Sequence, residues 1–547
     1  MVNDWLASLA LPFDPATLVD FTLVSAFSQE LANSSCNSFF ESYRAEDGTG
    51  RIRVRKGGQN RCWESLPLEW REYFEAIRDE NQRAQVLREL SIADPSSSLW
   101  HEFPSSLRDF LTSCRALSFD RTRSLEPILS YPPSDHTSRR SQPPASSDPL
   151  PHVSHLKGKA KAHHTNALKA GQSPKKHHEV VEFCALVQSM LQDERCSHCI
   201  DVGSGRAHLS RALASAPLDL HVLALDWAES QKTGAEKLDE IRKKAELNPT
   251  IGSLTHRVSS LDESGVRKVL DEWPPVSGGE FGSGDSRREP ALLVALHACG
   301  DLTPDAIKAF TDFSSSAADD DSLSSAPRAV FVGCCYNLQT PSTFPLSRSI
   351  GSVVATAAVP DAREPISLAH LRLTPQSPPT WHASTGATTA FLSATSKLAY
   401  RSRLEAELEW NGFGTEVGER KVGRIPDSRD WREYRRKAIE RMTQRDGPDA
   451  TLPTPCRFGS DEDEDEGDSD DWREGLFLLR TWWTIRSWLG PPLESLVVLD
   501  RYLLLCEGLY PARAEAQVDG GKQRQVEMVN IFDQATGSLR NIALVVR

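Results

Sequence analysis

A glycine-rich turn between an apolar strand and a helix is the feature that most constrains how this chain can fold. The run CIDVGSGRAHLSR, residues 199–211, begins as a short apolar strand and breaks at Gly203 and Gly205 before a helix-forming stretch. Glycine adopts backbone conformations closed to other residues and lets a ligand approach without a Cβ in the way. This order is typical of nucleotide-type cofactor sites. The alternative is a glycine turn in an α/β protein without such a cofactor.

Asp201 and His208 distinguish two classes of cofactor. A dinucleotide-binding turn of the G-x-G-x-x-G type would have its third glycine at position 208, which is a histidine here. An acidic residue two places before the first glycine, as Asp201 is, is more usual of S-adenosyl-L-methionine (SAM) sites. SAM has an amino acid end and no pyrophosphate, so its site needs a tight turn and carboxylates rather than a helix N-terminus aimed at phosphate. The cofactor residues predicted in this turn are Asp201, Gly203, Ser204 and Gly205.

The next two strands extend the predicted cofactor site. An apolar run at 220–225 ends in Asp226, where a doubly wound fold places the carboxylate that accepts both ribose hydroxyls. The adjacent Trp227 either flanks the adenine or packs in the core. A third strand at 254–258 is followed by Ser260 and Leu261, where folds that bind SAM commonly contact adenine. With helices between these strands, the pattern predicts a parallel α/β sheet.

Polar residues follow two further apolar strands, at 291–296 and 329–332. Ligands of open α/β sheets bind at the carboxyl ends of strands, so chemistry is expected there. His297 is the candidate base, because an imidazole titrates near working pH. Asp301 would orient it or accept a substrate hydrogen bond, and Tyr336 would line the substrate pocket. The alternative for His297 is a buried side chain that is hydrogen-bonded to backbone.

Cysteines lie at the same strand ends, at positions 299, 334 and 335. We interpret them as packing residues or pocket walls, because methyl transfer from SAM needs no covalent enzyme intermediate. Cys196 and Cys199 form one CxxC pair without a second pair at zinc-ribbon spacing. The sequence therefore predicts no structural metal, with Cys199 pointing into the core.

Composition indicates a protein of two or three domains that works in a reducing compartment. The chain has 547 residues, a net charge of −13 and eleven cysteines without a repeating frame. Nine carboxylates lie in residues 461–471 alone, so the remainder is nearly neutral. Scattered cysteines are typical of reduced thiols, which predicts a cytoplasmic or nuclear location. No apolar run approaches the length of a membrane span, and the first 27 residues lack the basic residues of a signal or presequence.

Changes in composition along the chain predict its domains. We expect a mainly helical accessory domain at 1–128, a flexible Pro/Ser-rich and basic linker at 129–165, and an α/β domain at 166–547 with disordered insertions near 276–289, 314–326 and 446–471. Ser173 and Pro174 predict a helix start, and Lys175 beside them is assigned to the cofactor site. The basic, alternating piece 50–57 predicts an edge hairpin, with nucleic-acid contact as the alternative.

The C-terminal part holds further predicted elements. Helices are expected at 428–445 and 472–489. The apolar runs 493–506, 527–533 and 542–546 are expected to supply the final antiparallel strands of the sheet.

Seven segments in order resemble a known family. They are SPKKHHEV (173–180), DVGSGRAHLSR, LHACGDLT (296–303), GCCYNL (333–338), FPLS (344–347), LESLVVLDRYLLL (493–505) and RNIALVVR (540–547). They resemble the methyltransferase-domain family that includes methyltransferase-like protein 25 and the rRNA adenine dimethylase domain-containing proteins. In this chain Arg206 replaces the usual lysine and Ala207 replaces a glycine.

The resemblance implies a Rossmann-like SAM-dependent methyltransferase fold, a seven-stranded sheet with helices on both faces, after a mainly helical N-terminal domain. The signature of adenine N6 methylation, Asn/Asp-Pro-Pro-Phe/Tyr, is absent. We therefore expect a SAM-dependent methyltransferase with a macromolecular acceptor, protein or RNA, and no membrane partner. The alternative is a binding or scaffold protein that keeps the fold without catalysis.

Overall fold

A computed structural model describes most of the chain. The described residues are 9, 11–34, 39–44, 50–54, 62–132, 171–192, 196–244, 252–273, 291–317, 327–361, 363–410, 423–446, 470–510 and 524–547. The expected insertion at 276–289 lies outside them, as do most of the expected linker, residues 318–326 of the insertion expected at 314–326 and residues 447–469 of the one expected at 446–471. The remaining residues of these two insertions, 314–317, 446, 470 and 471, are helical, which corrects their expected bounds. The described residues form two compact units. The first comprises Met1–Val24, Leu117–Pro375 and Pro491–Arg547, and the second comprises Ser25–Ala116 and Gln376–Gly490.

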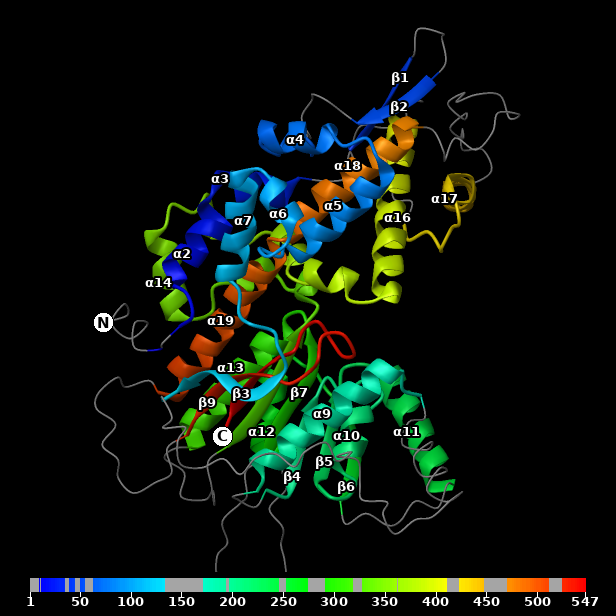
Figure 1. Ribbon diagram of the computed structural model, residues 1–547. Helices are drawn as coiled ribbons and strands as arrows, with labels where there is room; N and C mark the ends of the chain where they lie inside the picture. Colours follow the sequence, from blue (N-terminus) through cyan, green and yellow to red (C-terminus); the bar gives the residue numbers. More distant parts are fainter. Residues whose placement is uncertain are drawn as a thin grey trace, which may run out of the picture. The chain divides into compact units, whose positions relative to one another are not determined.

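Five neighbouring parallel strands form one side of the sheet in the first unit, out to its edge at β6 (Figure 1). They are β4 (His198–Val202), β5 (His221–Asp226), β6 (Ser253–Val258), β7 (Leu292–Cys299) and β8 (Arg328–Cys334). Their order in the sheet is β6-β5-β4-β7-β8. Sequence order therefore reverses direction at β4, which pairs with β5 on one side and β7 on the other. A reversal of this kind is where open α/β sheets bind their ligands.

Three further strands complete one edge of the sheet. β10 (Ile542–Val546) pairs antiparallel with β8, β9 (Val526–Asn530) pairs antiparallel with β10, and β3 (Ser124–Tyr131) pairs antiparallel with β9. Within the described part of the chain the sheet thus has eight strands, where the sequence predicted seven. The additional strand, β3, contains Pro127 and two register shifts. A proline and an irregular register are typical of an edge strand. They also interrupt the alternation of apolar and polar residues by which a strand is recognised in the sequence.

Helices cover both faces of the sheet (Figure 1). α9 (Pro174–Met190) and α10 (His208–Leu213) bury apolar side chains with Cys199, Val222 and Val294 on one face. α11 (Glu229–Lys244) lies on that face too, because its Ala235 packs against Ala224. α13 (Leu302–Ala317), which contacts α12 (Glu263–Glu272), packs on the other face, where Phe310 meets Phe331. Side chains alternate along a strand, so the apolar strands fill both cores.

The apolar run 493–506 was wrongly predicted as a strand. It lies in the helix α19 (Gly490–Leu509). Nearly every residue of this run is buried, so it shows neither the period of an amphipathic helix nor that of a half-buried strand. Its length exceeds that of most strands and is the signal that favours a helix. The remaining elements of the first unit are α2 (Pro15–Val19), the π-helix η1 (Asp20–Val24), α14 (Arg348–Thr356), α15 (Leu368–Leu373) and the 3-10 turns η4 (Tyr336–Leu338) and η5 (Pro341–Thr343).

The second unit is mainly helical. Its elements are α3 (Ala26–Asn33), β1 (Phe40–Arg44), β2 (Gly50–Val54), α4 (Leu68–Glu75), α5 (Glu80–Ile92), α6 (Ser98–Glu102), α7 (Ser105–Ala116), the 3-10 turn η6 (Pro378–His382), α16 (Thr385–Trp410), α17 (Trp431–Asp446) and α18 (Asp470–Ser487). β1 and β2 pair antiparallel, which confirms the hairpin expected around residues 50–57.

The division into units corrects the expected domain boundaries at residues 376–490. The sequence predicted one domain for 166–547, but this stretch packs with 25–116 instead. In α18 the Trp482 ring lies 6.1 Å from Phe39 and the Phe477 ring lies 6.5 Å from Phe74, centroid to centroid. Packing between segments so far apart leaves no trace in local composition.

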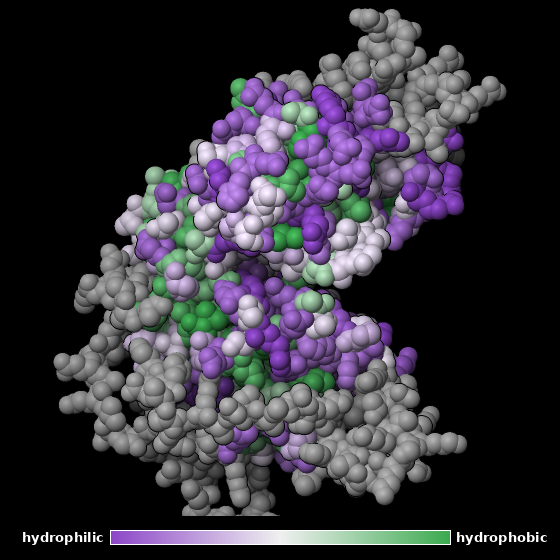
Figure 2. Space-filling model, in the orientation of Figure 1, coloured by the Kyte–Doolittle hydropathy of each residue, from purple (hydrophilic) through white to green (hydrophobic). Residues whose placement is uncertain are grey.

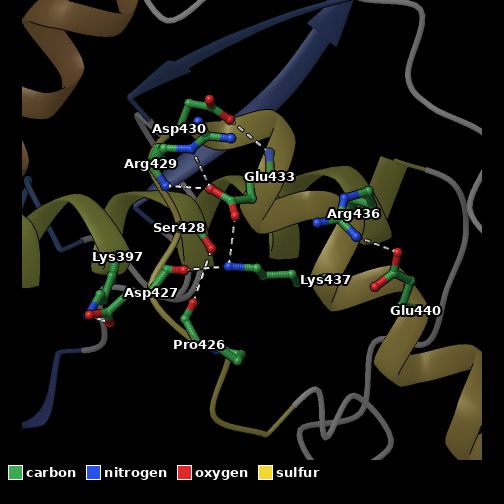
Figure 3. Close-up of polar contacts among 10 residues, drawn as sticks. All are labelled: Lys397, Pro426, Asp427, Ser428, Arg429, Asp430, Glu433, Arg436, Lys437 and Glu440. Atoms are coloured by element: carbon green, nitrogen blue, oxygen red, sulfur yellow. Dashed lines mark hydrogen bonds and ion pairs between the residues drawn. The ribbon is translucent and has the colours of Figure 1, made fainter.

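The start of α17 is fixed by exposed polar residues (Figure 3). Asp430 Oδ1 accepts a hydrogen bond from the Glu433 N–H at 2.8 Å, and Glu433 Oε2 accepts one from the Arg429 N–H at 2.8 Å. One turn further on, Arg436 pairs with Glu440 at 2.6 Å. Exposed ion pairs typically contribute about 0.2–1 kcal/mol. These contacts therefore define where the helix begins more than they stabilise the unit.

The face of the protein drawn in Figure 2 is largely hydrophilic where residues are described, with hydrophobic side chains in scattered groups. Among the described helices, none combines the length and the apolar character that crossing a membrane requires.

Candidate active site

The glycine turn is tied to the end of the neighbouring strand. The N–H groups of Gly203 and Ser204 both donate to the Leu225 carbonyl of β5, at 2.9 and 3.0 Å. Gly203 and Gly205 have φ angles of 75° and 54°, in the left-handed region that favours glycine. A Cβ on Gly203 would lie 2.9 Å from Leu302, whereas one on Gly205 would meet nothing within 4 Å. The turn is therefore packed at Gly203 and open at Gly205.

Asp226 holds the other side of this turn. Its Oδ2 accepts a hydrogen bond from the Gly205 N–H at 2.9 Å, and its Oδ1 accepts one from the Ala228 N–H at 3.0 Å. Each carboxylate oxygen can accept a second hydrogen bond, so Asp226 can still bind hydroxyl groups. Trp227 beside it is 74% exposed, so it does not pack in the core. The structure therefore leaves an aromatic ring uncovered next to the buried carboxylate.

The end of β6 lies beside Asp226. The Ser259 N–H donates to the Asp226 carbonyl at 3.1 Å, which places Ser260 and Leu261 immediately after this contact. Asp262 caps α12 by accepting from the Gly265 N–H at 2.8 Å. The structure thus brings together the predicted residues at the ends of β4, β5 and β6.

Asp201 lies buried beneath the turn and accepts a hydrogen bond from the Ser210 hydroxyl at 2.5 Å. Burial raises the pKa of Asp201 to about 6, and the Ser210 hydroxyl and the Lys176 ammonium oppose this rise. The basic residue that interacts with Asp201 is therefore Lys176. Lys175, which the sequence assigned to the cofactor site, has a side chain that is more than half exposed. Burial also lowers the pKa of Lys176, against the attraction of Glu179 and Asp201.

His297 occupies an irregular position at the end of β7. Its φ is 64°, and the register between β7 and β8 shifts at this residue. A non-glycine residue in this conformation is strained, and such strain clusters at functional sites. His297 Nε2 lies 2.8 Å from Oε2 of Glu179, which is buried in α9. The partner of His297 is therefore a side chain, not backbone as the alternative interpretation held.

Glu179 is the residue that sequence reasoning missed. Burial alone would raise its pKa, but the hydrogen bond and charge of His297, with Lys176 and Lys175, lower it. Its other oxygen, Oε1, is buried and has no hydrogen-bond partner among the described residues, with Lys175 Nζ 4.0 Å away. Glu179 is the first acidic residue after a basic stretch, but nothing local links it to a histidine 118 positions later.

Asp301 does not orient His297. Its carboxylate accepts hydrogen bonds from the Thr340 N–H at 2.9 Å, the Thr340 hydroxyl at 2.6 Å and the Thr343 hydroxyl at 3.1 Å. Both oxygens thus accept hydrogen bonds from the segment after β8. This corrects the predicted orienting role, because the threonines supply donors to both carboxylate oxygens and Glu179 takes the place beside His297.

Tyr336 is buried rather than exposed in a pocket. It is 2% exposed, the Arg501 guanidinium lies 4.9 Å from its ring centroid, and the buried Glu494 carboxyl interacts with it electrostatically. Burial raises the pKa of Tyr336. The preceding Cys335 has a φ of 48°, which redirects the chain after β8. Tyr336 therefore anchors this segment to α19, a correction to its expected role as a pocket wall.

Three thiols gather at the ends of β7 and β8. Cys299 lies opposite Cys334 in the parallel register, with the two sulfur atoms 3.2 Å apart. The Cys334 and Cys335 sulfur atoms are 3.6 Å apart. Cys199, by contrast, is fully buried, as predicted. The three sulfur atoms lie within 4.8 Å of one another.

Comparison with known families assigns the region that contains these strand ends. Residues 175–340 match a family model described as a methyltransferase domain. The chain contains a methyltransferase domain. The match begins at Lys175, includes the glycine turn, Asp226 and His297, and ends at Thr340. No solved structure gives a significant match to the chain.

The match to the methyltransferase domain does not extend to α19, β9 or β10. The narrower resemblance to methyltransferase-like protein 25 and the rRNA adenine dimethylase domain-containing proteins, which also used residues 344–347, 493–505 and 540–547, stays a prediction.

Proposed function

We propose that this chain is a SAM-dependent methyltransferase whose methyl donor is held at the carboxyl ends of β4, β5 and β6. The observation that carries the proposal is the hydrogen bond that joins the glycine turn to Asp226. Gly205 donates its N–H to the Asp226 carboxylate, which can still accept further hydrogen bonds. This contact lies beside β4, where the strand order reverses, and within the methyltransferase domain. The donor-site residues would be Asp201, Gly203, Ser204, Gly205, Asp226, Trp227, Ser260 and Leu261.

The residues present fit such a donor at three points. Gly205 leaves open space where a side chain would stand, so a ligand can approach the backbone closely. The uncovered Trp227 ring suits stacking with an adenine. The unpartnered Oε1 of Glu179 suits an amino group, because a buried carboxylate oxygen without a hydrogen bond is unfavourable.

His297 is the proposed general base. SAM would supply an activated methyl group, and the protein would have to position the acceptor and take its proton. When His297 Nε2 donates to Glu179, its Nδ1 is left as the proton acceptor. Glu179 would fix this tautomer and stabilise the imidazolium that forms, as carboxylates do in other acid–base pairs. Glu179 thus has two roles in this proposal: its Oε2 positions His297, and its Oε1 would contact the amino group of the donor.

The proposal also names the class of molecule that accepts the methyl group. We propose a macromolecular acceptor, protein or RNA, in the cytoplasm or nucleus, where the chain's many thiols stay reduced.

Labelled methyl transfer tests the activity. The full chain is incubated with SAM that carries a tritiated methyl group. Protein and RNA extracts from cells that lack this protein supply the unmethylated acceptors. Digestion with protease or ribonuclease then identifies the labelled class. We expect His297→Gln to lower the rate at least about tenfold, because general-base catalysis contributes at least that much. His221→Gln, at the amino end of β5, is the control and should retain the rate. SAM binding without any label transfer would contradict catalysis.

A further inference from the structure

The three thiols at the ends of β7 and β8 form a compact donor set that methyl transfer does not use. Cys299 and Cys334 lie on neighbouring strands at paired positions, and Cys335 follows directly. Cys299 is exposed, Cys335 is half-buried and Cys334 is buried, so the set is open on one side. Cys335 has a left-handed φ of 48°, a conformation that favours glycine. With this backbone conformation, the Cys335 sulfur lies 3.6 Å from that of Cys334.

The sulfur separations suit a metal ion. In a tetrahedral zinc site, Zn–S bonds of about 2.3 Å set sulfur–sulfur distances of about 3.8 Å. Here two of the distances are 3.2 and 3.6 Å, and all three sulfur atoms lie within 4.8 Å of one another. Small side-chain rotations would therefore bring the three sulfur atoms to equal distances from one ion. A donor set of thiols alone selects soft ions and disfavours Mg²⁺ and Ca²⁺.

Two basic side chains lie close to the three thiols. Lys176 interacts electrostatically with Cys299 and Cys334, and Arg540 interacts with Cys299 and Cys335. Their positive charges would offset part of the negative charge that remains when three thiolates bind one divalent ion.

We propose that Cys299, Cys334 and Cys335 bind one Zn²⁺ through three thiolates, with the fourth position open on the exposed side. Binding would release the thiol protons and form three Zn–S bonds, with no change of oxidation state. Three protein ligands and one open position are typical of zinc sites that also bind a water or a substrate atom. The site would lie at the same end of the sheet as His297, but its formation does not depend on SAM.

Zinc content and affinity test this site on the full chain. The reduced protein is freed of metal with a chelator and titrated with Zn²⁺ against a competing zinc indicator. Cd²⁺ is then added to apo protein, and its sulfur-to-metal charge-transfer absorption counts the bound thiolates. Cys299→Ser and Cys335→Ser each remove one ligand at the open side. Cys196→Ser is the matched control, because it removes a cysteine of the separate CxxC pair. Thermal unfolding of each variant checks that it folds.

We expect one Zn²⁺ to bind per chain, and we expect the thiols to release protons to the solution when it binds. Each cluster variant should weaken the affinity at least about a hundredfold, since even outer-shell changes at zinc sites weaken binding by about 10–100-fold. Cys196→Ser should bind as the unmodified chain does.

Three results would overturn the proposal. They are Zn²⁺ binding weaker than about micromolar, equal binding by the folded cluster variants, and loss of binding in Cys196→Ser alone. A chain that forms a Cys299–Cys334 disulfide on oxidation but binds no Zn²⁺ when reduced also counts against it. All these measurements are made without SAM, so they stand apart from the outcome for methyl transfer.

Discussion

Several residues in this site have a strained backbone or a buried side chain that the sequence around them does not predict. The glycine turn and Asp226 could be predicted because their spacing along the chain is itself the signal. Glu179 could not, because its role comes from a contact between α9 and the end of β7. The burial of Tyr336 could not be predicted either, since it depends on Arg501 and Glu494 of α19.

Asp201 gives a prediction about pH at this scale. Its folded pKa of about 6 lies above its ordinary value of 3.8, so the folded state binds this proton more tightly than the unfolded state. The folded protein therefore loses stability, relative to a chain with a neutral residue here, as the pH rises from about 4 through 6. Asp201→Asn cannot titrate and keeps an acceptor for the Ser210 hydroxyl. We expect the variant to gain about 3 kcal/mol relative to the unmodified chain between pH 4 and pH 7.

Urea unfolding across that pH range measures this difference. Asp271→Asn, on an exposed part of α12, controls for the loss of one negative charge. A difference between Asp201→Asn and the unmodified chain that stays constant with pH would show that the buried carboxyl does not have the raised pKa.

At the scale of elements, α19 connects two segments that resemble the family although they lie far from the glycine turn in sequence. They are residues 344–347 and 493–505. In α19, Asp500 accepts hydrogen bonds from the N–H groups of Leu346 and Ser347, both at 2.8 Å. Two turns later, Glu507 accepts from the N–H groups of Arg348 and Ser349, at 2.8 and 2.9 Å. Together they satisfy the free N–H groups at the start of α14. The strands of the parallel sheet were predictable from their apolar runs, whereas a helix buried on all sides was not.

Asp500→Ala should destabilise the protein by about 2–3 kcal/mol at pH 7. The change leaves the buried Ser347 N–H and hydroxyl and the partly buried Leu346 N–H without their acceptor, and one buried group of this kind costs about 1–3 kcal/mol. The loss is limited because burial raises the pKa of Asp500 to about 6, so its ionised form is itself unfavourable. Chemical denaturation gives the free energy of unfolding. Glu272→Ala, which removes an exposed ion pair with Arg257, should change it by less than about 0.5 kcal/mol. Equal effects of the two changes would refute the capping role.

At the scale of the whole molecule, each compact unit is built from segments that are distant in sequence. Local composition predicted an N-terminal domain and a C-terminal domain, but it could not predict that 376–490 completes the core of 25–116. Arg486 of α18, for example, donates to the carbonyls of Leu31 and Ala32 at 3.0 and 2.7 Å, and Trp488 donates to the Leu90 carbonyl at 2.9 Å.

A chain truncated to residues 166–547 should therefore not fold like the full chain. It would lack β3 at the edge of the sheet and the residues Phe39 and Phe74, which pack against Trp482 and Phe477 of α18. Exposed apolar surface of this kind promotes association. We expect the truncated chain to bind a hydrophobic dye strongly and to lose near-ultraviolet circular dichroism, compared with the full chain at equal concentration. Cooperative unfolding of the truncated chain with an unchanged midpoint would show that the expected domain is independent after all.

The proposed site for the methyl donor is centred on the hydrogen bond between the Gly205 N–H and Asp226. Isothermal titration of the full chain with SAM, S-adenosylhomocysteine and NAD tests it most directly, with Asp226→Asn as the variant and Asp271→Asn as the control. We predict one site per chain for SAM and S-adenosylhomocysteine and none for NAD. Asp226→Asn should weaken SAM binding at least about tenfold, because a hydrogen bond to a charged group contributes about 1.5–3 kcal/mol. Binding of NAD without SAM, or SAM affinity that Asp226→Asn leaves unchanged, would contradict the assignment.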